Sequence, residues 1–172
     1  MKKLFTLALV ALFSASVMAQ HEIGAVVGGL NGASYKYWIS SNLAVQADLA
    51  VGLTAAYTGA YWKGSKFGEG QMDHWDFMLN PNLAYHFDLP ANFKLYCGGG
   101  VGIGMLGGFG SSSILGKAGA NALVGAAYHF PSMPLVMALD FRPGYAIGFE
   151  DASYPHYSMF DWKIGFAVRY VL

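Results

Sequence analysis

The last thirteen residues of the chain alternate between large apolar side chains and small or charged ones. Every even position from Phe160 onward is large and apolar, whereas the odd positions include Asp161 and Lys163. Successive side chains of a β-strand point to opposite faces, so this pattern predicts a strand with one apolar and one polar face. Segments 135–149 and 73–87 repeat the pattern, which makes β-structure the strongest prediction from this sequence.

Weaker alternation in five further segments brings the number of predicted strands to eight. These segments are 22–30, 33–39, 43–57, 93–105 and 117–130. Most of the eight have the roughly 9–11 residues that a tilted strand needs to cross a hydrocarbon core. The connections are short at 40–42, 88–92 and 131–134 and long at 63–72, 107–116 and 150–157. Asn31-Gly32 predicts a tight hairpin turn between the first two strands.

Residues 1–19 have the layout of a secretory signal peptide. Two lysines follow the initial methionine, and an uncharged, mostly apolar run then continues to small residues that end at Ala19. We therefore expect export through the inner membrane and cleavage after Ala19, which leaves 20–172 as a single domain. Removal of the two lysines leaves 8 basic residues (10 − 2 = 8) against 10 acidic ones, and this balance argues against a nucleic-acid partner.

The composition is unusual for a water-soluble domain. Hydrophobic residues make up 55% of the chain and charged residues 12%, compared with about 25% charged residues in typical soluble domains. After residue 19, however, no apolar run reaches the roughly 20 residues of a transmembrane helix. A closed barrel reconciles these observations, because it pairs every backbone polar group between strands. The sequence therefore predicts an all-β fold, an eight-stranded antiparallel up-and-down transmembrane β-barrel.

Side-chain size indicates which face of the barrel points outward. The apolar faces are bulky and carry aromatic residues near both strand ends, like the two aromatic girdles of membrane barrels. The opposite faces are rich in small residues, most clearly from Gly98 to Gly104, which suits the narrow interior of an eight-stranded barrel. A soluble lipocalin-like barrel that carries an apolar ligand has the reverse arrangement and is an alternative.

Two prolines, Pro81 and Pro143, fall on the apolar, outward register of their strands. Proline cannot donate a ladder hydrogen bond and is normally confined to sheet edges or bulges. Because a closed barrel has no edge, we expect a local bulge at each proline.

The polar faces carry nearly balanced charges that the barrel would enclose. Enclosed charges are tolerated when they are paired and hydrogen-bonded. We expect Asp140 and Arg142 to meet Asp161 and Lys163 on the neighbouring strand, in a network that plugs the lumen and prevents conduction. The expected interior network comprises Asp48, Asp76, Lys94, Asp140, Arg142, Asp161, Lys163 and Arg169.

The alternating strands, the short and long connections and the closing residues Phe166, Val168, Tyr170 and Leu172 resemble the small outer-membrane β-barrel proteins of the OmpX and OmpA-transmembrane-domain type, often called porin-like. The resemblance implies a location in the outer membrane of a Gram-negative bacterium, contact with lipid and lipopolysaccharide, and assembly by the barrel-assembly machinery. That machinery is expected to recognise the closing residues, although the family usually ends in Phe or Trp where this chain has Leu172. The group includes structural proteins, adhesins and enzymes, so the resemblance implies no single activity.

Two segments are candidates for function. His156 and Ser158 are similar to the His-x-Ser pair of lipid A deacylases, so a lipid A modifying hydrolase is an alternative to a non-enzymatic role. The connection that contains Lys63, Lys66 and Phe67 is the candidate surface for an unidentified extracellular partner, since loops on rigid strands often carry function. We expect no cofactor and no metal site, and favour a structural or adhesive role through the outer loops.

Overall fold

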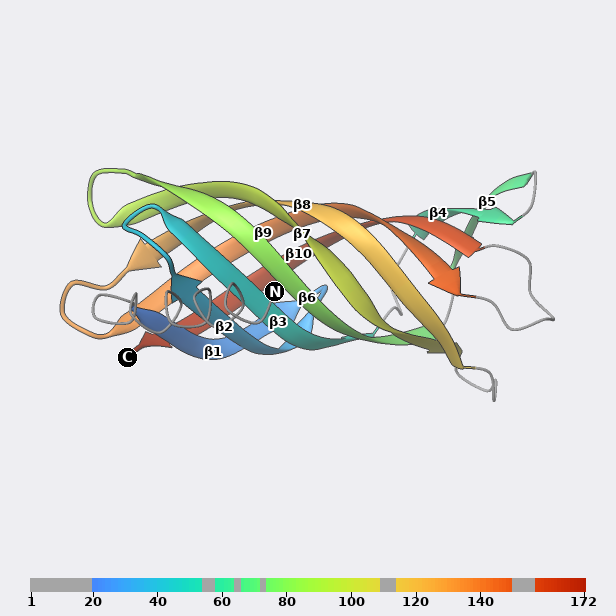
Figure 1. Ribbon diagram of the computed structural model, residues 1–172, viewed down its shortest axis with the longest axis horizontal. Coiled ribbons are helices and arrows are strands. Elements are labelled where there is room, and N and C mark those ends of the chain that lie inside the picture. The colour runs from blue at the N-terminus through green and yellow to red at the C-terminus, as the bar shows by residue number, and fades with distance from the viewer. Residues whose placement is uncertain (1–19, 54–57, 64–65, 72–73, 109–113, 150–156) are drawn as a thin grey trace, which may run out of the picture.

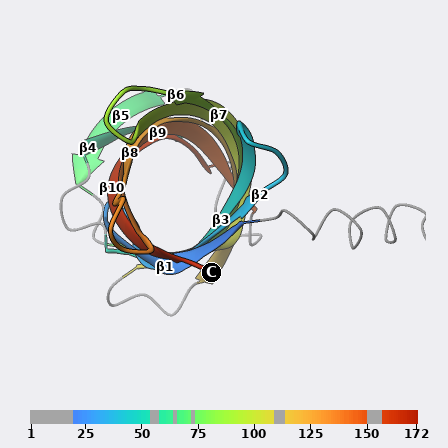
Figure 2. The same ribbon diagram turned by 90° about the vertical axis from the view of Figure 1, so that its left-hand side faces the viewer.

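Eight antiparallel strands close into a barrel in the computed structural model of the chain (Figure 1, Figure 2). Each barrel strand pairs with the next one along the chain, and β1 pairs with β10 to close the wall. The structure describes residues 20–53, 58–63, 66–71, 74–108, 114–149 and 157–172. The barrel strands are β1 (His21–Gly28), β2 (Asn31–Trp38), β3 (Leu43–Leu53), β6 (His74–Asp88), β7 (Phe93–Gly108), β8 (Ile114–His129), β9 (Leu135–Phe149) and β10 (Tyr157–Val171). The eight predicted strands and the predicted fold class are confirmed.

The two ends of the barrel differ in their connections. The connections 39–42, 89–92 and 130–134 lie at one end together with Leu172, and we call this the turn end. The opposite end, the loop end, carries the β4–β5 hairpin and the last residues of β7 and β9. The turn end is on the left in Figure 1 and faces the viewer in Figure 2.

Most of segment 63–72, predicted as a long loop, belongs to a β-hairpin. Strands β4 (Thr58–Lys63) and β5 (Lys66–Gln71) pair with each other, and β4 also pairs with residues 157–159 of β10. The loop prediction was wrong because this hairpin is held by backbone pairing of β4 with β5 and of β4 with β10, and its sequence lacks the alternating apolar residues that identified the other strands. The hairpin therefore extends the barrel wall at the loop end.

The predicted hairpin turn between β1 and β2 spans Gly28 to Asn31, so Gly32 already lies within β2. The Asn31 side chain closes this turn, since it accepts a hydrogen bond from the Gly28 amide at 3.1 Å and donates one to the Gly28 carbonyl at 2.9 Å. Gly28 has a φ of 120°, a value that side-chain-bearing residues rarely adopt. The glycine and the asparagine together make this turn tight.

Pro81 and Pro143 do not produce the expected bulges. Two residue pairs, at Asn80 and Pro81, are missing from the β6–β7 ladder, and two, at Arg142 and Pro143, are missing from the β8–β9 ladder. The register is the same on both sides of each gap. The bulge prediction was wrong because the wall accommodates each proline by a local loss of pairing and inserts no extra residue.

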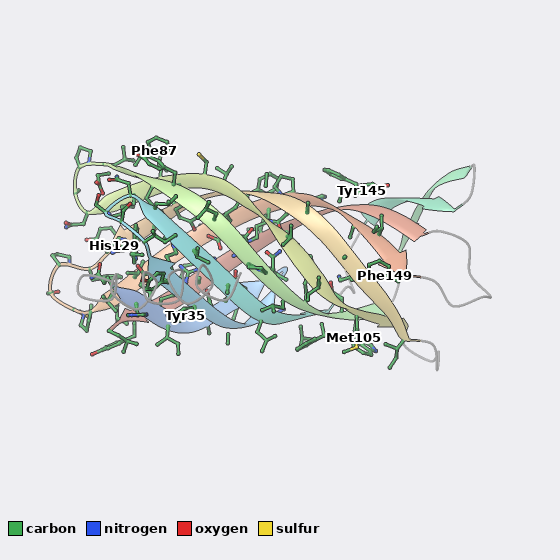
Figure 3. All side chains as sticks on the ribbon, viewed as in Figure 1. Tyr35, Phe87, Met105, His129, Tyr145 and Phe149 are labelled. Atoms are coloured by element: carbon green, nitrogen blue, oxygen red, sulfur yellow. The ribbon has the colours of Figure 1, made fainter. Side chains whose placement is uncertain are left out.

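Large apolar side chains cover the outer wall. Along β10, Phe160, Trp162 and Ile164 expose 52%, 46% and 49% of their surface, whereas Lys163 and Arg169 are buried. Figure 3 shows outward side chains near both ends, including Phe87 near the turn end and Tyr145 near the loop end. A soluble lipocalin-like barrel needs the reverse arrangement, so that alternative was wrong. Among the described residues, no helix is long and apolar enough to cross a membrane.

Candidate functional site: the polar interior of the barrel

Arg142 lies at the centre of the interior and joins two opposite parts of the wall. Its guanidinium forms ion pairs with Asp48 of β3, at 2.6 Å, and with Asp140 of its own strand β9. Both carboxylates have no exposed surface and Arg142 is 3% exposed. Gln46 donates hydrogen bonds to both carboxylates at 3.1 Å, and the Tyr96 hydroxyl donates to Asp140. These donors satisfy several of the hydrogen-bond acceptor sites of the two buried carboxylates.

Arg169 extends the same network toward β10. Its Nε donates a hydrogen bond to Ser34 Oγ at 2.8 Å, and its Nη2 lies 4.0 Å from an Asp140 oxygen. Arg169 has no exposed surface. The central network therefore connects side chains from β2, β3, β7, β9 and β10.

A second cluster of charges lies nearer the loop end. The Asp76 carboxylate pairs with Lys117 of β8 and with Lys163 of β10, the latter at 3.2 Å. A cavity of about 40 Å³ lies in this part of the lumen, where the small inward residues of the wall leave space. The charged and amide residues that line the cavity are Asn80, Lys117, Asn121, Arg142 and Lys163.

Aromatic rings fill the lumen toward the turn end. The His86 ring lies between Trp38, at a centroid distance of 4.4 Å, and Tyr96, at 4.8 Å. Trp38 Nε1 donates a hydrogen bond of 2.7 Å to Glu22, and the Lys36 ammonium lies 4.7 Å from the centre of the Tyr96 ring. Such a cation above an aromatic face is attractive.

Lys94 lies at the mouth of the barrel at the turn end. Its ammonium pairs with Asp88 at 2.8 Å and lies 4.8 Å from the centre of the Trp38 ring. The Lys94 side chain is 23% exposed, in contrast to the fully enclosed charges of the central network. The exposure of the interior charges to solvent therefore falls from the turn end of the barrel to its centre.

Three asparagines form an amide cluster beside the two prolines. The Asn80 amide donates to Asn121 Oδ1, and the Asn121 amide donates to Asn82 Oδ1, both at 2.7 Å. Asn80 also donates to the Val101 carbonyl and Asn121 to the Ala122 carbonyl, both at 3.1 Å. By register, these two carbonyls lie opposite Pro81 and Pro143 respectively. The side-chain amides thus supply the N–H groups that the prolines lack.

The sequence did not identify the partners of the interior charges. The predicted charges that are buried in the structure are Asp48, Asp76, Asp140, Arg142, Lys163 and Arg169. Arg142 and Lys163 reach Asp48 and Asp76, which belong to β3 and β6. The side chain of Asp161 lies outside the described residues. The sequence placed Gln46 and His86 on the polar faces of their strands without identifying their contacts. It did not predict that Trp38 lies in the interior, where only its inward register could have indicated this position.

The two candidate functional segments lie largely outside what the structure describes. His156 is not among the described residues, and Ser158 is described as a backbone position of β10 paired with Ile147. Lys63 and Lys66 are described as backbone positions that pair across the β4–β5 hairpin, and Phe67 is the next residue of β5. Within the described residues, no three or more His, Cys, Asp or Glu side chains are grouped to hold a metal ion. The lipid A hydrolase alternative therefore stays a prediction.

No family model and no curated protein matches the sequence, but solved structures match over most of the chain. The crystal structure of Neisserial surface protein A (NspA) has a TM-score of 0.51 at 16% identity, over 88% of this chain and 93% of that chain. The N-terminal β-barrel domain of Pseudomonas aeruginosa OprF matches with a TM-score of 0.49 at 14% identity, over 90% of this chain and 96% of that chain. The likeness to NspA shows the fold, that of the small eight-stranded outer-membrane barrels.

Proposed function

We propose that the chain is an integral outer-membrane protein of a Gram-negative bacterium, a sealed barrel without enzymatic activity that has a structural or adhesive role through its loop end. The observation that carries this proposal is the apolar outer wall around a charged interior. Along β10 and the residue that follows it, the outward apolar residues run from Phe160 to Leu172. At roughly 3.3 Å per residue and a tilt of about 45°, they span about 28 Å of height, close to the apolar band of about 25 Å in such barrels.

The interior network supports a sealed lumen. Arg142 and its two carboxylates bridge the interior. Tyr96, which donates to Asp140, and His86, which stacks on Tyr96, are also buried. Purified protein in a planar lipid bilayer is therefore expected to give conductance at the lipid baseline. Steady single-channel steps would contradict the sealed interior while leaving the membrane location intact.

The difference between the barrel ends supports an orientation. Short turns face the periplasm and longer loops face outward in outer-membrane barrels, so the turn end is assigned to the periplasm. A membrane-impermeant amine reagent applied to intact cells is expected to modify Lys63 and Lys66. Lys94, at the turn end, serves as the internal control and should react only after the outer membrane is permeabilised. Modification of Lys94 alone in intact cells would reverse the orientation.

The β4–β5 hairpin is the proposed surface for contact outside the cell. Its pairing with β10 places it on the barrel wall, and function is often carried by segments that a rigid scaffold presents. We expect replacement of 58–71 by a short Gly-Ser linker to leave barrel folding intact, as measured by the gel shift between boiled and unboiled protein. Reduced attachment of cells with an intact envelope would support the adhesive role, and increased detergent sensitivity would support the structural role. An unchanged phenotype in both assays would contradict both roles.

The proposed partners during biogenesis and in the membrane follow from the outer wall. The last four outward residues of the chain lie on the outer wall and expose 37%, 40%, 49% and 70% of their surface; they are Phe166, Val168, Tyr170 and Leu172. We propose that the barrel-assembly machinery recognises these residues when it inserts the last strand. The same wall would contact phospholipid and lipopolysaccharide. Depletion of the assembly machinery should remove the folded protein from the outer membrane.

A further inference from the structure

Gln20 would be the N-terminal residue of the exported chain, and its position determines the chemistry of that terminus. The sequence predicts cleavage between Ala19 and Gln20. The first ladder pair of β1 is His21 with Tyr37, so one residue, Gln20, lies between the predicted cleavage point and the ladder. The Gln20 carbonyl accepts a hydrogen bond from the Trp38 amide at 3.2 Å, and the His21 carbonyl accepts one from Leu172 at 2.8 Å. Cleavage after Ala19 would therefore leave every ladder residue in place and make Gln20 the new terminus.

The α-nitrogen and the side chain of Gln20 are available for reaction once the preceding peptide bond is cleaved. Gln20 is exposed, and no hydrogen bond holds its side-chain amide among the described residues. Gln20 lines a cavity of about 150 Å³ at the turn end, together with Trp38, Ser40 and Lys94. A five-membered ring formed from the α-nitrogen, Cα, Cβ, Cγ and Cδ would leave the anchored carbonyl outside the ring, so the hydrogen bond to Trp38 can persist.

We propose that the mature chain carries an N-terminal pyroglutamate formed from Gln20. This inference rests on the export and the cleavage after Ala19 that the sequence predicts. The lone pair of the new α-amino group attacks the side-chain carboxamide carbon, a bond forms between this nitrogen and Cδ, and the bond from Cδ to the amide nitrogen breaks. The α-nitrogen loses one proton to the leaving nitrogen, which departs as ammonia. The step is intramolecular and needs no oxidant or second substrate.

The modification would remove both the charge and the nucleophilicity of the chain terminus. The product is an uncharged lactam at the periplasmic mouth, where aminopeptidases lose the free amine that they require. Because the ladder starts at His21, cyclisation is not required for folding.

The test is mass spectrometry of the N-terminal peptide from protein taken directly from freshly isolated outer membranes. We expect a peptide that begins at Gln20, is lighter than its sequence by one ammonia and does not react with an amine label. The matched control is Gln20→Asn, which keeps a side-chain amide but would have to form a strained four-membered ring. We expect this variant to be cut at the same bond and to react with the label.

The outcomes separate the inference from the proposed function. A peptide that begins at Gln20 with a reactive amine, or that loses ammonia only on storage, would overturn the pyroglutamate. A chain cut at another bond would also overturn it while leaving export intact. A membrane-bound chain that retains residues 1–19 would overturn both the cleavage and this inference.

Discussion

Arg142 shows how a single residue holds the interior together. It is nearly fully buried and pairs with two carboxylates that have no exposed surface. Desolvation makes an isolated buried charge costly, so both carboxylates depend on Arg142 and Arg142 depends on them. The same ion-pair chemistry contributes little where water reaches it, as at the pair of Lys94 with the exposed Asp88.

Replacement of Arg142 by Met is expected to destabilise the barrel by about 3–5 kcal/mol, because Asp48 would lose its ion pair while buried and Asp140 would keep only the more distant Arg169. The measurement is the free energy of unfolding in urea for protein folded into lipid vesicles. The matched control is Lys94→Met, which should change the free energy by less than about 1 kcal/mol because its partner is solvated. Equal changes in the free energy of unfolding would contradict the distinction between the buried Arg142 network and the solvent-exposed Lys94 pair.

Ala91 is a second informative residue, in the connection between β6 and β7. Ala91 and Asn92 have φ values of 61° and 64°, in the left-handed region that costs an ordinary residue roughly 1–2 kcal/mol. Asparagine tolerates this region better than alanine does. The strain at this turn is therefore concentrated at Ala91.

Replacement of Ala91 by Gly is expected to stabilise the folded barrel by about 0.5–1 kcal/mol, since relief of the left-handed strain exceeds the entropic cost of glycine. The free energy of unfolding in vesicles measures this change. Ala126→Gly, in a strand of the same barrel, is the control and should destabilise. A loss of stability on Ala91→Gly would show that this backbone conformation carries no strain.

At the scale of the strands, the two prolines and the amide cluster form one structural unit. Each proline removes a ladder donor from the side of its strand that faces β7 or β8, and an asparagine amide replaces it. Because the cluster links Asn80 to Asn121, the two compensations depend on each other. Near the two prolines, side-chain hydrogen bonds therefore replace part of the backbone pairing of β7 with β6 and of β8 with β9.

A double-mutant cycle between Asn80→Ala and Pro81→Ala tests this compensation. We expect Asn80→Ala to cost about 1 kcal/mol more when Pro81 is present than when alanine restores the backbone N–H, because only the former leaves the Val101 carbonyl unsatisfied. The four unfolding free energies, measured in vesicles, give the coupling directly. Additive effects would mean that the Asn80 bond to Val101 does not replace the missing donor.

At the scale of the whole molecule, the sequence predicted the features that depend on strand periodicity. Alternation identified all eight barrel strands and both wall faces, because each apolar face must meet lipid while the opposite face is enclosed. It missed the β4–β5 hairpin, which is formed by backbone pairing of its two strands with each other and of β4 with β10 and has no alternating apolar pattern. It also could not pair Arg142 with Asp48, because residues so far apart along the chain meet only after closure fixes the strand order and register.

The central claim is that the bulky apolar wall contacts lipid and the charged face does not. Two native tryptophans test it, since Trp162 is 46% exposed on the outer wall and Trp38 is 7% exposed in the lumen. In variants that retain one of these tryptophans and have Phe at the other tryptophan positions, fluorescence is measured in vesicles of brominated phospholipid. We expect strong quenching of Trp162 and little quenching of Trp38. Quenching of Trp38 with protection of Trp162 would contradict the account.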